Sequence, residues 1–312
     1  MHAPWASSSI DSIYRTVPRR LAPLLLALLA LAASPARADS ASRLSRLPSA
    51  PRPPTLPELA HADREATVEL TSGAYYPRDT GAYRGHVPIH VLRLATEMPL
   101  HERSLFVGGT YEAAFGSPAG PRAPFVLGGN TEIHGRAVWS TTTGLAFGAG
   151  LGVMLPTASF DPNSIDAFSL SSAAIAMRPW DHAFFQSGTF ALRPFVDVHD
   201  TVGPFLIQFR EGLDWTFDVR SSTGQRAFSL ATLYVAIRPV DWVALGVEAY
   251  QLYIIDAPVA DERRAFFAVS PSVRLMLKYV QPAIGMIRSV GPPFYPGTDS
   301  TVAMRTGLTL LW

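Results

Sequence analysis

In the stretch FLIQFREGLDWTFDV, residues 205–219, apolar and polar side chains alternate along most of its length. Successive side chains of a β-strand point to opposite faces of the sheet, so this period of two predicts a strand with one apolar face and one ionic face. The stretch is also far longer than the mean soluble strand of about 5–6 residues. We call the two alternating sets of positions the apolar parity and the polar parity of a strand. Here the apolar parity, at odd numbers, is Phe205, Ile207, Phe209, Glu211, Leu213, Trp215, Phe217 and Val219. The polar parity, at even numbers, is Gln208, Arg210, Gly212, Asp214, Thr216 and Asp218.

The same alternation recurs along the chain after about residue 64. In the stretch 265–279, for example, Phe267, Val273 and Leu275 oppose Arg274 and Lys278. Some windows are regular and others less so, and no long window has a convincing helical period. We predict strands at about 66–76, 87–97, 104–115, 125–139, 145–155, 165–178, 188–198, 205–219, 227–238, 242–255, 265–279, 280–290 and 302–312.

Strands of this length suit a membrane better than water. A tilted strand needs about 9–11 residues to cross a bilayer. Charged residues make up 16% of the chain, against about 25% in soluble domains. A soluble β-sandwich also alternates, but its solvent face would carry abundant lysine and glutamate. Because a sheet in lipid cannot leave edge amides unpaired, we predict an all-β fold, a closed antiparallel transmembrane β-barrel over residues 64–312.

The lengths of the connections predict the topology. In bacterial outer-membrane barrels the short turns face the periplasm and the longer loops face outside. Trp139, Trp242 and Trp312 then all lie at the periplasmic end, where an aromatic girdle is expected. Short links occur at 140–142, 238–242 and 278–282, and long ones at YPRDTGAYRGHV, GSPAGPRAP, LPTASFDPNSID and SVGPPFYPGTDST.

The number of windows conflicts with the even strand number of such barrels. The turns at 140–142 and 238–242 should lie at the same end, which requires an even number of strands between them. The windows between residues 143 and 238 are odd in number, so one of them is not a strand or one strand is missed. We expect about 12 strands, with 14 as the alternative.

The amino terminus predicts export. Arg15, Arg19 and Arg20 precede the apolar run 21–33, and Ala36 and Ala38 form a small-x-small cleavage site. We predict a signal peptide over residues 1–38, cleaved after Ala38. The run of about 13 apolar residues is too short for a transmembrane anchor, and the sequence after the two arginines is a poor twin-arginine signal. Residues 39–63 are rich in proline and are expected to form a disordered periplasmic linker.

The last residues carry a resemblance to a known signal. Arg305, Gly307, Leu310 and Trp312 stand in the order polar, glycine, hydrophobic, terminal aromatic. This pattern looks like the carboxy-terminal sorting signal of Gram-negative outer-membrane β-barrels. The resemblance implies recognition by the barrel assembly machinery and a place in the outer membrane. Trp312 also suits an interfacial anchor because its ring is amphipathic.

The segment GLAFGAGLGVMLPT, residues 144–157, carries a looser resemblance. It is similar to the glycine-rich strand and turn of the barrel family of aromatic-degradation meta-pathways, although Ala158 stands where that family has glycine. The resemblance implies transport of small hydrophobic molecules. Alternating glycines also suit a crowded lumen wall, where large side chains from other strands need room.

The polar parity defines a predicted lumen lining. Its acidic and basic groups balance, which fits either a cross-linked, neutral interior or a narrow polar pore without strong charge selectivity. Glu69, Arg264 and Arg305 share this parity. The lumen-lining set is Glu112, Glu132, His134, Arg136, Arg193, Asp197, Gln208, Arg210, Asp214, Asp218, Glu248, Arg274 and Lys278.

Catalysis has weak support in the sequence. A lipid hydrolase needs a serine and a histidine together on the lipid-facing wall, whereas His134 has the polar parity. A protease of the omptin type needs pairs of acidic residues and histidines at the extracellular rim. Two segments of the chain contain an acidic residue next to a histidine. No metal-ligand spacing, nucleophile elbow or phosphate-binding loop occurs. The pairs in these segments are Asp181 with His182, and His199 with Asp197 and Asp200.

These observations favour an outer-membrane channel for the passive or facilitated passage of small solutes. The alternative is a closed structural or adhesion barrel that acts through loops such as 157–164, and a barrel-embedded enzyme of lipase or protease type is third. The expected partners are the outer-membrane bilayer, the assembly machinery and small solutes. A net charge of +1 gives no footprint for nucleic acid. With no cysteine in the chain, we expect no thiolate metal site. We also expect no cofactor, because no cofactor-binding motif occurs.

Overall fold

The computed structural model describes residues 64–75, 87–101, 104–116, 125–141, 145–158, 160–161, 164–219, 225–256, 264–290 and 301–312. The predicted signal peptide, its cleavage site and the linker 39–63 lie outside the described residues. Among the described residues, no helix has both the length and the apolar character needed to cross a membrane.

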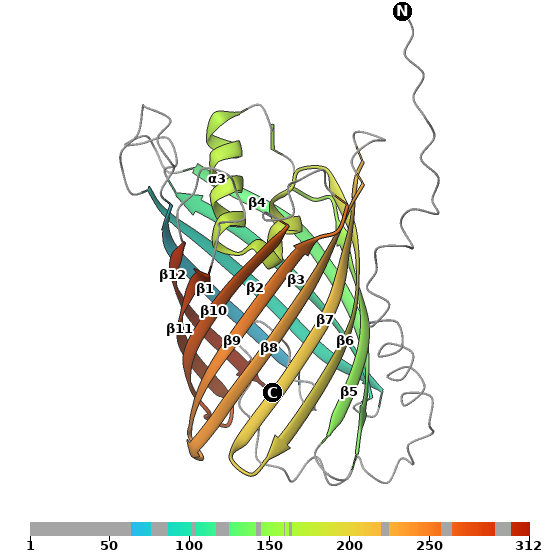
Figure 1. Cartoon of the computed structure of the whole chain (residues 1–312), viewed down its shortest axis with the longest axis vertical. Helices are drawn as coiled ribbons and strands as arrows, with labels where there is room; N and C mark the ends of the chain where they lie inside the picture. Colours follow the sequence, from blue (N-terminus) through green and yellow to red (C-terminus); the bar gives the residue numbers. More distant parts are fainter. Residues whose placement is uncertain are drawn as a thin grey trace, which may run out of the picture. The chain divides into compact units, whose positions relative to one another are not determined.

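Twelve antiparallel strands form one closed barrel (Figure 1) in which each strand pairs with its neighbours in the chain and β1 pairs with β12. The all-β prediction and the strand number of twelve are confirmed, and the alternative of fourteen is wrong. The strands are β1 (Glu65–Tyr75), β2 (Val87–His101), β3 (Leu105–Gly116), β4 (Phe125–Ser140), β5 (Ala146–Leu155), β6 (Thr189–Val202), β7 (Phe205–Asp218), β8 (Arg226–Val240), β9 (Val243–Ile254), β10 (Ala265–Leu275), β11 (Val280–Val290) and β12 (Val302–Leu311).

The last strand closes the barrel. β12 pairs with β1 from Glu65 opposite Leu311 to Gly73 opposite Ala303. Beyond these pairs, Arg64 and Trp312 exchange two backbone hydrogen bonds of 3.2 Å. Closure leaves neither β1 nor β12 as a free edge, which is what a sheet in hydrocarbon requires.

The two ends of the barrel differ in their connections. The links after β2, β4, β6, β8 and β10 are short, whereas those after the odd-numbered strands are longer. We call these ends the short-turn end and the long-loop end. Trp139 near the end of β4, Trp242 in the β8–β9 turn and Trp312 after β12 all lie at the short-turn end and are exposed, as predicted.

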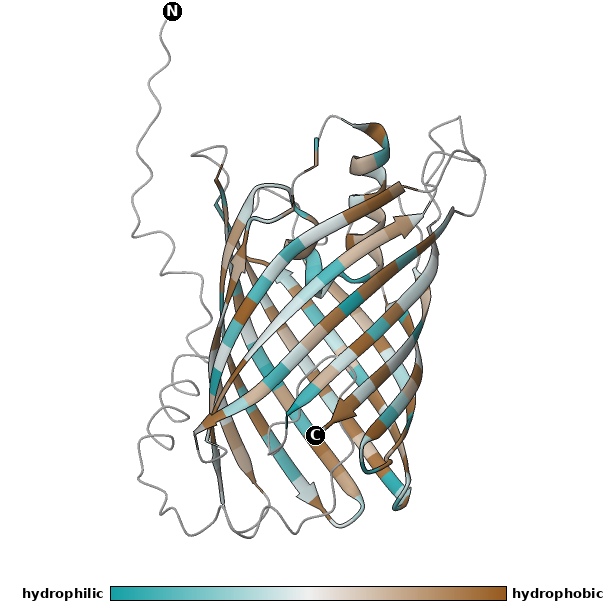
Figure 2. Ribbon diagram, turned by 180° about the vertical axis from the view of Figure 1, so that it is seen from behind, coloured by the Kyte–Doolittle hydropathy of each residue, from teal (hydrophilic) through white to brown (hydrophobic). Residues whose placement is uncertain are grey.

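Alternation along the strands separates the outer wall from the lumen. In β7, Phe205 and Ile207 are each 51% exposed, whereas Gln208 is fully buried. Figure 2 shows the resulting alternation of apolar and polar residues along the strands. The barrel therefore presents an apolar outer belt and keeps ionisable side chains inside.

One predicted strand is wrong. Residues 165–178 form α3 (Ile165–Met177), which is followed by the 3-10 helix η3 (Pro179–Phe185). Both belong to the connection between β5 and β6, and we call residues 165–185 the helical insert. Most of α3 is buried, and a helix that is apolar all round lacks the stripe that marks an amphipathic helix. The insert lies at the long-loop end (Figure 1).

Candidate functional site

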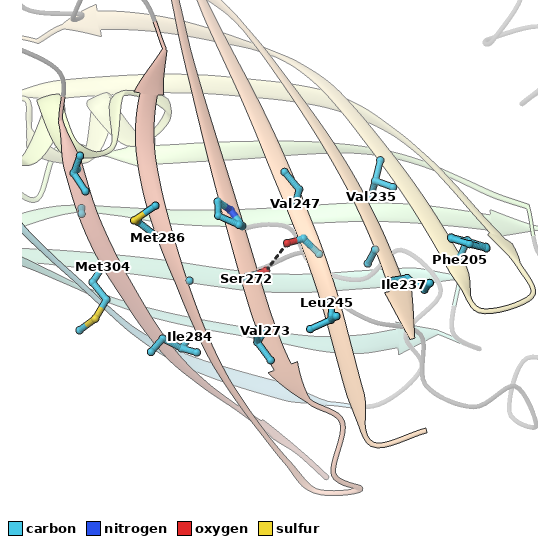
Figure 3. A pocket seen from close by; sticks show the side chains of 16 residues that line it. Phe205, Val235, Ile237, Leu245, Val247, Ser272, Val273, Ile284, Met286 and Met304 are labelled. Atoms are coloured by element: carbon cyan, nitrogen blue, oxygen red, sulfur yellow. Dashed lines mark hydrogen bonds between the residues drawn. The ribbon is translucent and has the colours of Figure 1, made fainter. Parts of the chain in front are cut away.

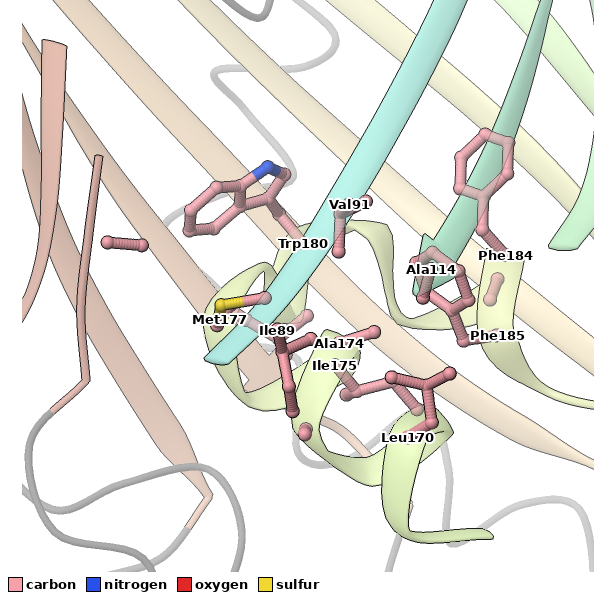
Figure 4. Packing of buried hydrophobic residues seen from close by; sticks show 14 of the residues in the cluster. Ile89, Val91, Ala114, Leu170, Ala174, Ile175, Met177, Trp180, Phe184 and Phe185 are labelled. Carbon is pink, nitrogen blue, oxygen red and sulfur yellow. The ribbon is translucent and has the colours of Figure 1, made fainter. Parts of the chain in front are cut away.

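The helical insert fills the lumen near the long-loop end with apolar side chains. Leu170, Ile175, Met177 and Phe185 are at most 2% exposed. Figure 4 shows them in one cluster with Ile89 of β2. The cluster also contains inward side chains of the wall, including Val91, Ala114, Leu127, Met154, Phe228, Leu252, Phe266 and Ile287. This half of the lumen is therefore a hydrophobic core between wall and insert.

Polar contacts fix the η3 end of the insert to β4. The amide nitrogen of Asn130 donates to the carbonyl oxygens of Ala183 and Gln186, both at 2.8 Å. Its amide oxygen accepts from the backbone N–H of Ala158, also at 2.8 Å. Asn130 is fully buried, so this side chain satisfies three backbone groups where water is excluded.

Arg178 lies at the point where α3 ends and η3 begins, and it is fully buried. Its guanidinium donates to Glu69 of β1 at 2.5 Å and to Asp181 at 2.6 and 2.9 Å. A carboxylate oxygen of Glu112 on β3 lies 3.3 Å away. Burial opposes the charge, but the carboxylates of Glu112, Asp181 and Glu69 outweigh it and raise the pKa of Arg178. The insert thus places a permanent cation among wall carboxylates.

The wall carboxylates around Arg178 have partners on the wall as well. Glu69 also accepts from Arg305 of β12 at 2.7 Å. Arg305 reaches Glu248 of β9 at 3.2 Å and the Tyr250 hydroxyl at 2.8 Å, and Tyr250 in turn donates to Glu248. A connected set of polar contacts thus joins β1, β12 and β9 on one side of the lumen.

A second set of ion pairs joins β4, β6 and β7. Arg193 donates to Glu132 and, at 2.8 Å, to Asp214. It also donates to the carbonyl oxygen of Trp180 in the insert at 3.3 Å. The His134 ring lies 3.3 Å from a Glu132 oxygen, so it extends this set toward the short-turn end.

Bidentate pairs follow in the half of the lumen near the short-turn end. Arg136 donates twice to Glu97, each time at 2.7 Å. Arg210 donates twice to Asp197 at 2.6 and 2.7 Å, and its guanidinium lies 4.0 Å from the centre of the Phe195 ring. Bidentate arginine–carboxylate pairs of this kind are among the strongest charge-assisted hydrogen bonds in proteins.

The glycines of β5 make room for these groups. A Cβ on Gly150 would overlap the Phe195 ring, and one on Gly152 would lie 3.1 Å from the Glu132 carboxyl carbon. The glycine-rich strand is therefore used as predicted for a crowded lumen wall.

The structure places almost all of the predicted lumen lining on the inner wall. Lys278 is the exception and is a correction: it lies exposed in the β10–β11 turn, with its ammonium 4.7 Å from the centre of the Tyr279 ring. Asp218 is half-buried at the last position of β7. The inward members are Glu112, Glu132, His134, Arg136, Arg193, Asp197, Gln208, Arg210, Asp214, Glu248 and Arg274.

The predicted protease-like pairs lie away from the rim. His182 is fully buried in η3, with its ring 4.1 Å from that of Phe228. Burial, aided by the Arg193 charge, lowers its pKa to about 3. His199 is buried on β6 near the short-turn end and contacts Thr201 at 3.1 Å. Neither histidine has the placement that a rim protease needs.

Sequence reasoning missed three charged residues of this site, Arg93, Glu97 and Arg178, and it gave Asp181 another role. Arg93 and Glu97 of β2 share the inward parity, opposite Leu92 and Leu94, and that alternation could have identified them. No strand parity could have placed Arg178 and Asp181, because they belong to the helical insert.

Two polar pairs on the outer wall were also missed. Ser72 and His90 contact each other at 2.9 Å, and the His90 ring stacks on Phe115. Among the described residues, no carboxylate or amide bonds the other ring nitrogen, so the pair lacks the third group of a hydrolase triad. Glu211 accepts from the Ser229 hydroxyl at 2.7 Å, midway along the apolar face of β7.

The outer wall also carries an apolar groove of about 810 Å³. It is lined from β7 to β12 by side chains such as Phe205, Leu245, Val273 and Met304, as Figure 3 shows. These side chains are 41–52% exposed and belong to the apolar outer belt. In the lumen, a polar cavity of about 20 Å³ lies beside Arg274 and Arg305, which is room for about one water molecule.

Comparison with a solved structure supports the architecture. No protein-family model and no curated sequence matches the chain. The COG4313 outer membrane channel from Pseudomonas putida F1 superposes with a TM-score of 0.59 at 11% identity, covering 84% of this chain and 99% of that one. The KdgM porin gives 0.46 at 9% identity, over 79% and 99%, and LpxR from Salmonella typhimurium gives 0.44 at 10%, over 80% and 100%. The first likeness shows that the chain has the fold of a porin-like outer-membrane barrel.

Proposed function

We propose that the mature chain, from Asp39 to Trp312, lies in the outer membrane of a Gram-negative bacterium and acts as a passive or facilitated channel for small solutes. The short-turn end then faces the periplasm and the long-loop end faces outside. Residues 1–38 are the export signal, cleaved after Ala38, and residues 39–63 are a periplasmic linker.

The ion pairs of the inner wall support a channel more than any other observation. Replacing a buried ion pair by apolar side chains of similar volume is often neutral or stabilising. A barrel with a purely structural task therefore gains little from lining its lumen with pairs such as Arg210 with Asp197 and Arg193 with Asp214. A lumen that admits water and solutes needs such a lining.

The pairing of these charges bears on the solute. A ring of one sign is the feature of a strongly ion-selective pore. Here each of the arginines Arg136, Arg193 and Arg210 bonds a carboxylate. We therefore infer a channel for small solutes with weak preference between cations and anions.

The terminal residues support a route of assembly. Arg305, Gly307, Leu310 and Trp312 are proposed to be recognised by the barrel assembly machinery. Arg305 has a second task in the folded barrel, because it bonds Glu69 and Glu248 in the lumen. Loss of Arg305 is thus expected to impair the folded barrel as well as its assembly.

Single-channel recording of the mature chain in a planar bilayer tests the proposal. Folding is first checked by heat-modifiable gel mobility. We expect discrete conductance steps. Arg210→Gln leaves Asp197 uncompensated in the lumen and should shift the reversal potential toward cation preference. Lys278→Gln, in the exposed turn, is the matched control and should leave it unchanged. Folded barrels that never conduct would contradict the proposal.

A further inference from the structure

We propose that the helical insert is a movable gate, closed in the conformation described here and held closed by Arg178. The inference rests on the proposed channel function. On opening, residues 165–185 leave the lumen toward the long-loop end and pivot about their connection to β6.

The insert blocks the path because it contacts opposite sides of the wall. On one side, Met177 occupies the space that a side chain at Gly73 of β1 would need. Nearly opposite, the His182 ring lies 4.1 Å from the ring of Phe228 on β8, which is five strands from β1 in the order of the barrel. Figure 4 shows Met177 and Trp180 in the packed cluster. A solute that enters from the long-loop end meets this cluster first.

The insert is held together by its own bonds, so it can move as a unit. The Ser171 hydroxyl of α3 donates to the carbonyl oxygen of Phe185 in η3 at 2.6 Å. The backbone N–H of Arg178 donates to Ala174 at 3.0 Å, and the Ser164 side chain caps the start of α3. These bonds need no partner on the wall.

The two ends of the insert are attached differently. Asn130 fixes the η3 end to β4, and Gly188, with a φ of 68°, makes the turn into β6. The other end begins with Ile165 and Phe168, which are 75% and 59% exposed. The pivot therefore lies near residues 186–188, and α3 is the part that moves most.

Arg178 is the charged link between insert and wall. It joins the insert to Glu69 and Glu112, whereas the Thr301 hydroxyl donates to the backbone carbonyl of Ala176 at 3.3 Å as a neutral link. A hydrogen bond to a charged group contributes more than a neutral one. Arg178 is therefore the charged contact whose loss should favour release of the insert from the lumen.

We call the contacts of Arg178 with Glu69 and Glu112 the latch. Each charged residue of the latch keeps another partner when the latch opens. On the wall, Glu69 retains Arg305 at 2.7 Å and Glu112 retains Arg93 at 3.5 Å. On the insert, Arg178 retains Asp181 at 2.6 Å. Leaving a buried charge unpaired is strongly destabilising, and this arrangement avoids that cost on both sides. Such duplicated pairing is what a reversible latch needs.

A disulfide lock tests the gate directly, because the chain has no cysteine of its own. The position for a Cβ on Gly73 lies 2.6 Å from the Met177 sulfur, so Gly73→Cys with Met177→Cys joins insert and wall. We expect oxidation to lower the conductance at least tenfold and reduction to restore it. Ser72→Cys with His90→Cys, which joins β1 to β2 on the outer wall, is the control and should respond to neither treatment.

A second variant releases the latch. Arg178→Met removes the cation but keeps an unbranched side chain, and we expect the open probability to rise about tenfold. Ala174, which is fully buried, reports the movement: in an Ala174→Cys background, a membrane-impermeant maleimide should label the Arg178→Met protein at least tenfold faster.

The outcomes separate the gate from the channel. A locked barrel that conducts like the reduced one overturns the gate and leaves the channel standing. If no variant conducts, the channel fails, and the labelling decides on the gate. Faster labelling of Ala174→Cys after the Arg178→Met change then supports a latched insert, and equal labelling overturns it.

Discussion

The two halves of the lumen solve the same packing problem in opposite ways. Near the long-loop end the inner wall is apolar, with Ile89, Val91 and Phe266, and the helical insert covers it. Near the short-turn end the buried inward side chains include ion pairs such as Arg136 with Glu97, and the helical insert does not cover them. An apolar inner wall facing water would lose the stabilisation that burial gives, about 25 cal/mol per Å². The difference shows why an insert is needed at one end only.

The largest expected effect separates the two faces of the insert. Phe185 is fully buried against the wall, so Phe185→Ala should lower the free energy of unfolding by about 3–5 kcal/mol. Phe168→Ala, on the exposed face of the same insert, should change it by about 0.5 kcal/mol or less. Urea titrations in lipid vesicles, followed by tryptophan fluorescence, measure both. Equal losses would mean that the insert does not pack in the lumen.

In the half of the lumen near the short-turn end, the stability effect of losing Arg210 should depend on whether Asp197 is still present. Arg210→Met alone leaves the buried Asp197 carboxylate unpaired and should cost about 3 kcal/mol. Adding Asp197→Leu should recover most of that loss, since apolar replacement of both partners is often neutral. The same titrations give the double-mutant cycle. If the double variant is no more stable than the single one, the pair does not contribute as described.

The attachment of the insert gives a smaller effect. Asn130→Ala leaves one backbone N–H and two carbonyl oxygens without this partner, and we expect a loss of about 1–3 kcal/mol. Thr131→Ala, next in the chain but on the outer wall, is the control. Its hydroxyl bonds an exposed threonine, Thr157, at 3.1 Å. A loss at Thr131 as large as that at Asn130 would refute the three-way attachment.

The smallest effect concerns pH. Burial lowers the pKa of His182 from 6.5 to about 3, so the folded protein keeps this ring neutral while the unfolded chain binds a proton below about pH 6.5. Stability therefore falls as the pH drops from about 6.5 toward 3, by about 1.4 kcal/mol per pH unit from this group. His182→Gln should reduce that slope. Unfolding midpoints of both proteins at pH 7 and pH 5 measure this pH dependence. If stability depends on pH equally in the parent and in His182→Gln, the lowered pKa of His182 is wrong.

Strand periodicity predicted most of the wall, because each wall residue faces either lipid or lumen. It failed at 165–178, where the lumen surrounds α3 and most of its residues are buried. The even-number rule had located the error between residues 143 and 238, although it could not name the window. The prediction that Lys278 lines the lumen failed for another reason. Lys278 has the same parity as Arg274, but β10 ends at Leu275, before Lys278.

Parity also predicts which charges face inward, but not which of them meet. Arg193 and Glu132 bond across β5, because the glycines between them leave the space. Such a pair depends on strand order and register, which a single parity does not contain. Arg178 depends on the insert and had no signal in the strand pattern.

Osmotic swelling of proteoliposomes in a small neutral sugar tests most directly that the lumen is a passage closed by the insert. The intact mature chain is compared with a variant in which residues 165–185 are replaced by a short Gly-Ser linker, and folding of both is checked by heat-modifiable gel mobility. We predict swelling at least tenfold faster without the insert. Two folded barrels that swell equally slowly would show that removing the insert opens no passage, and would contradict this account.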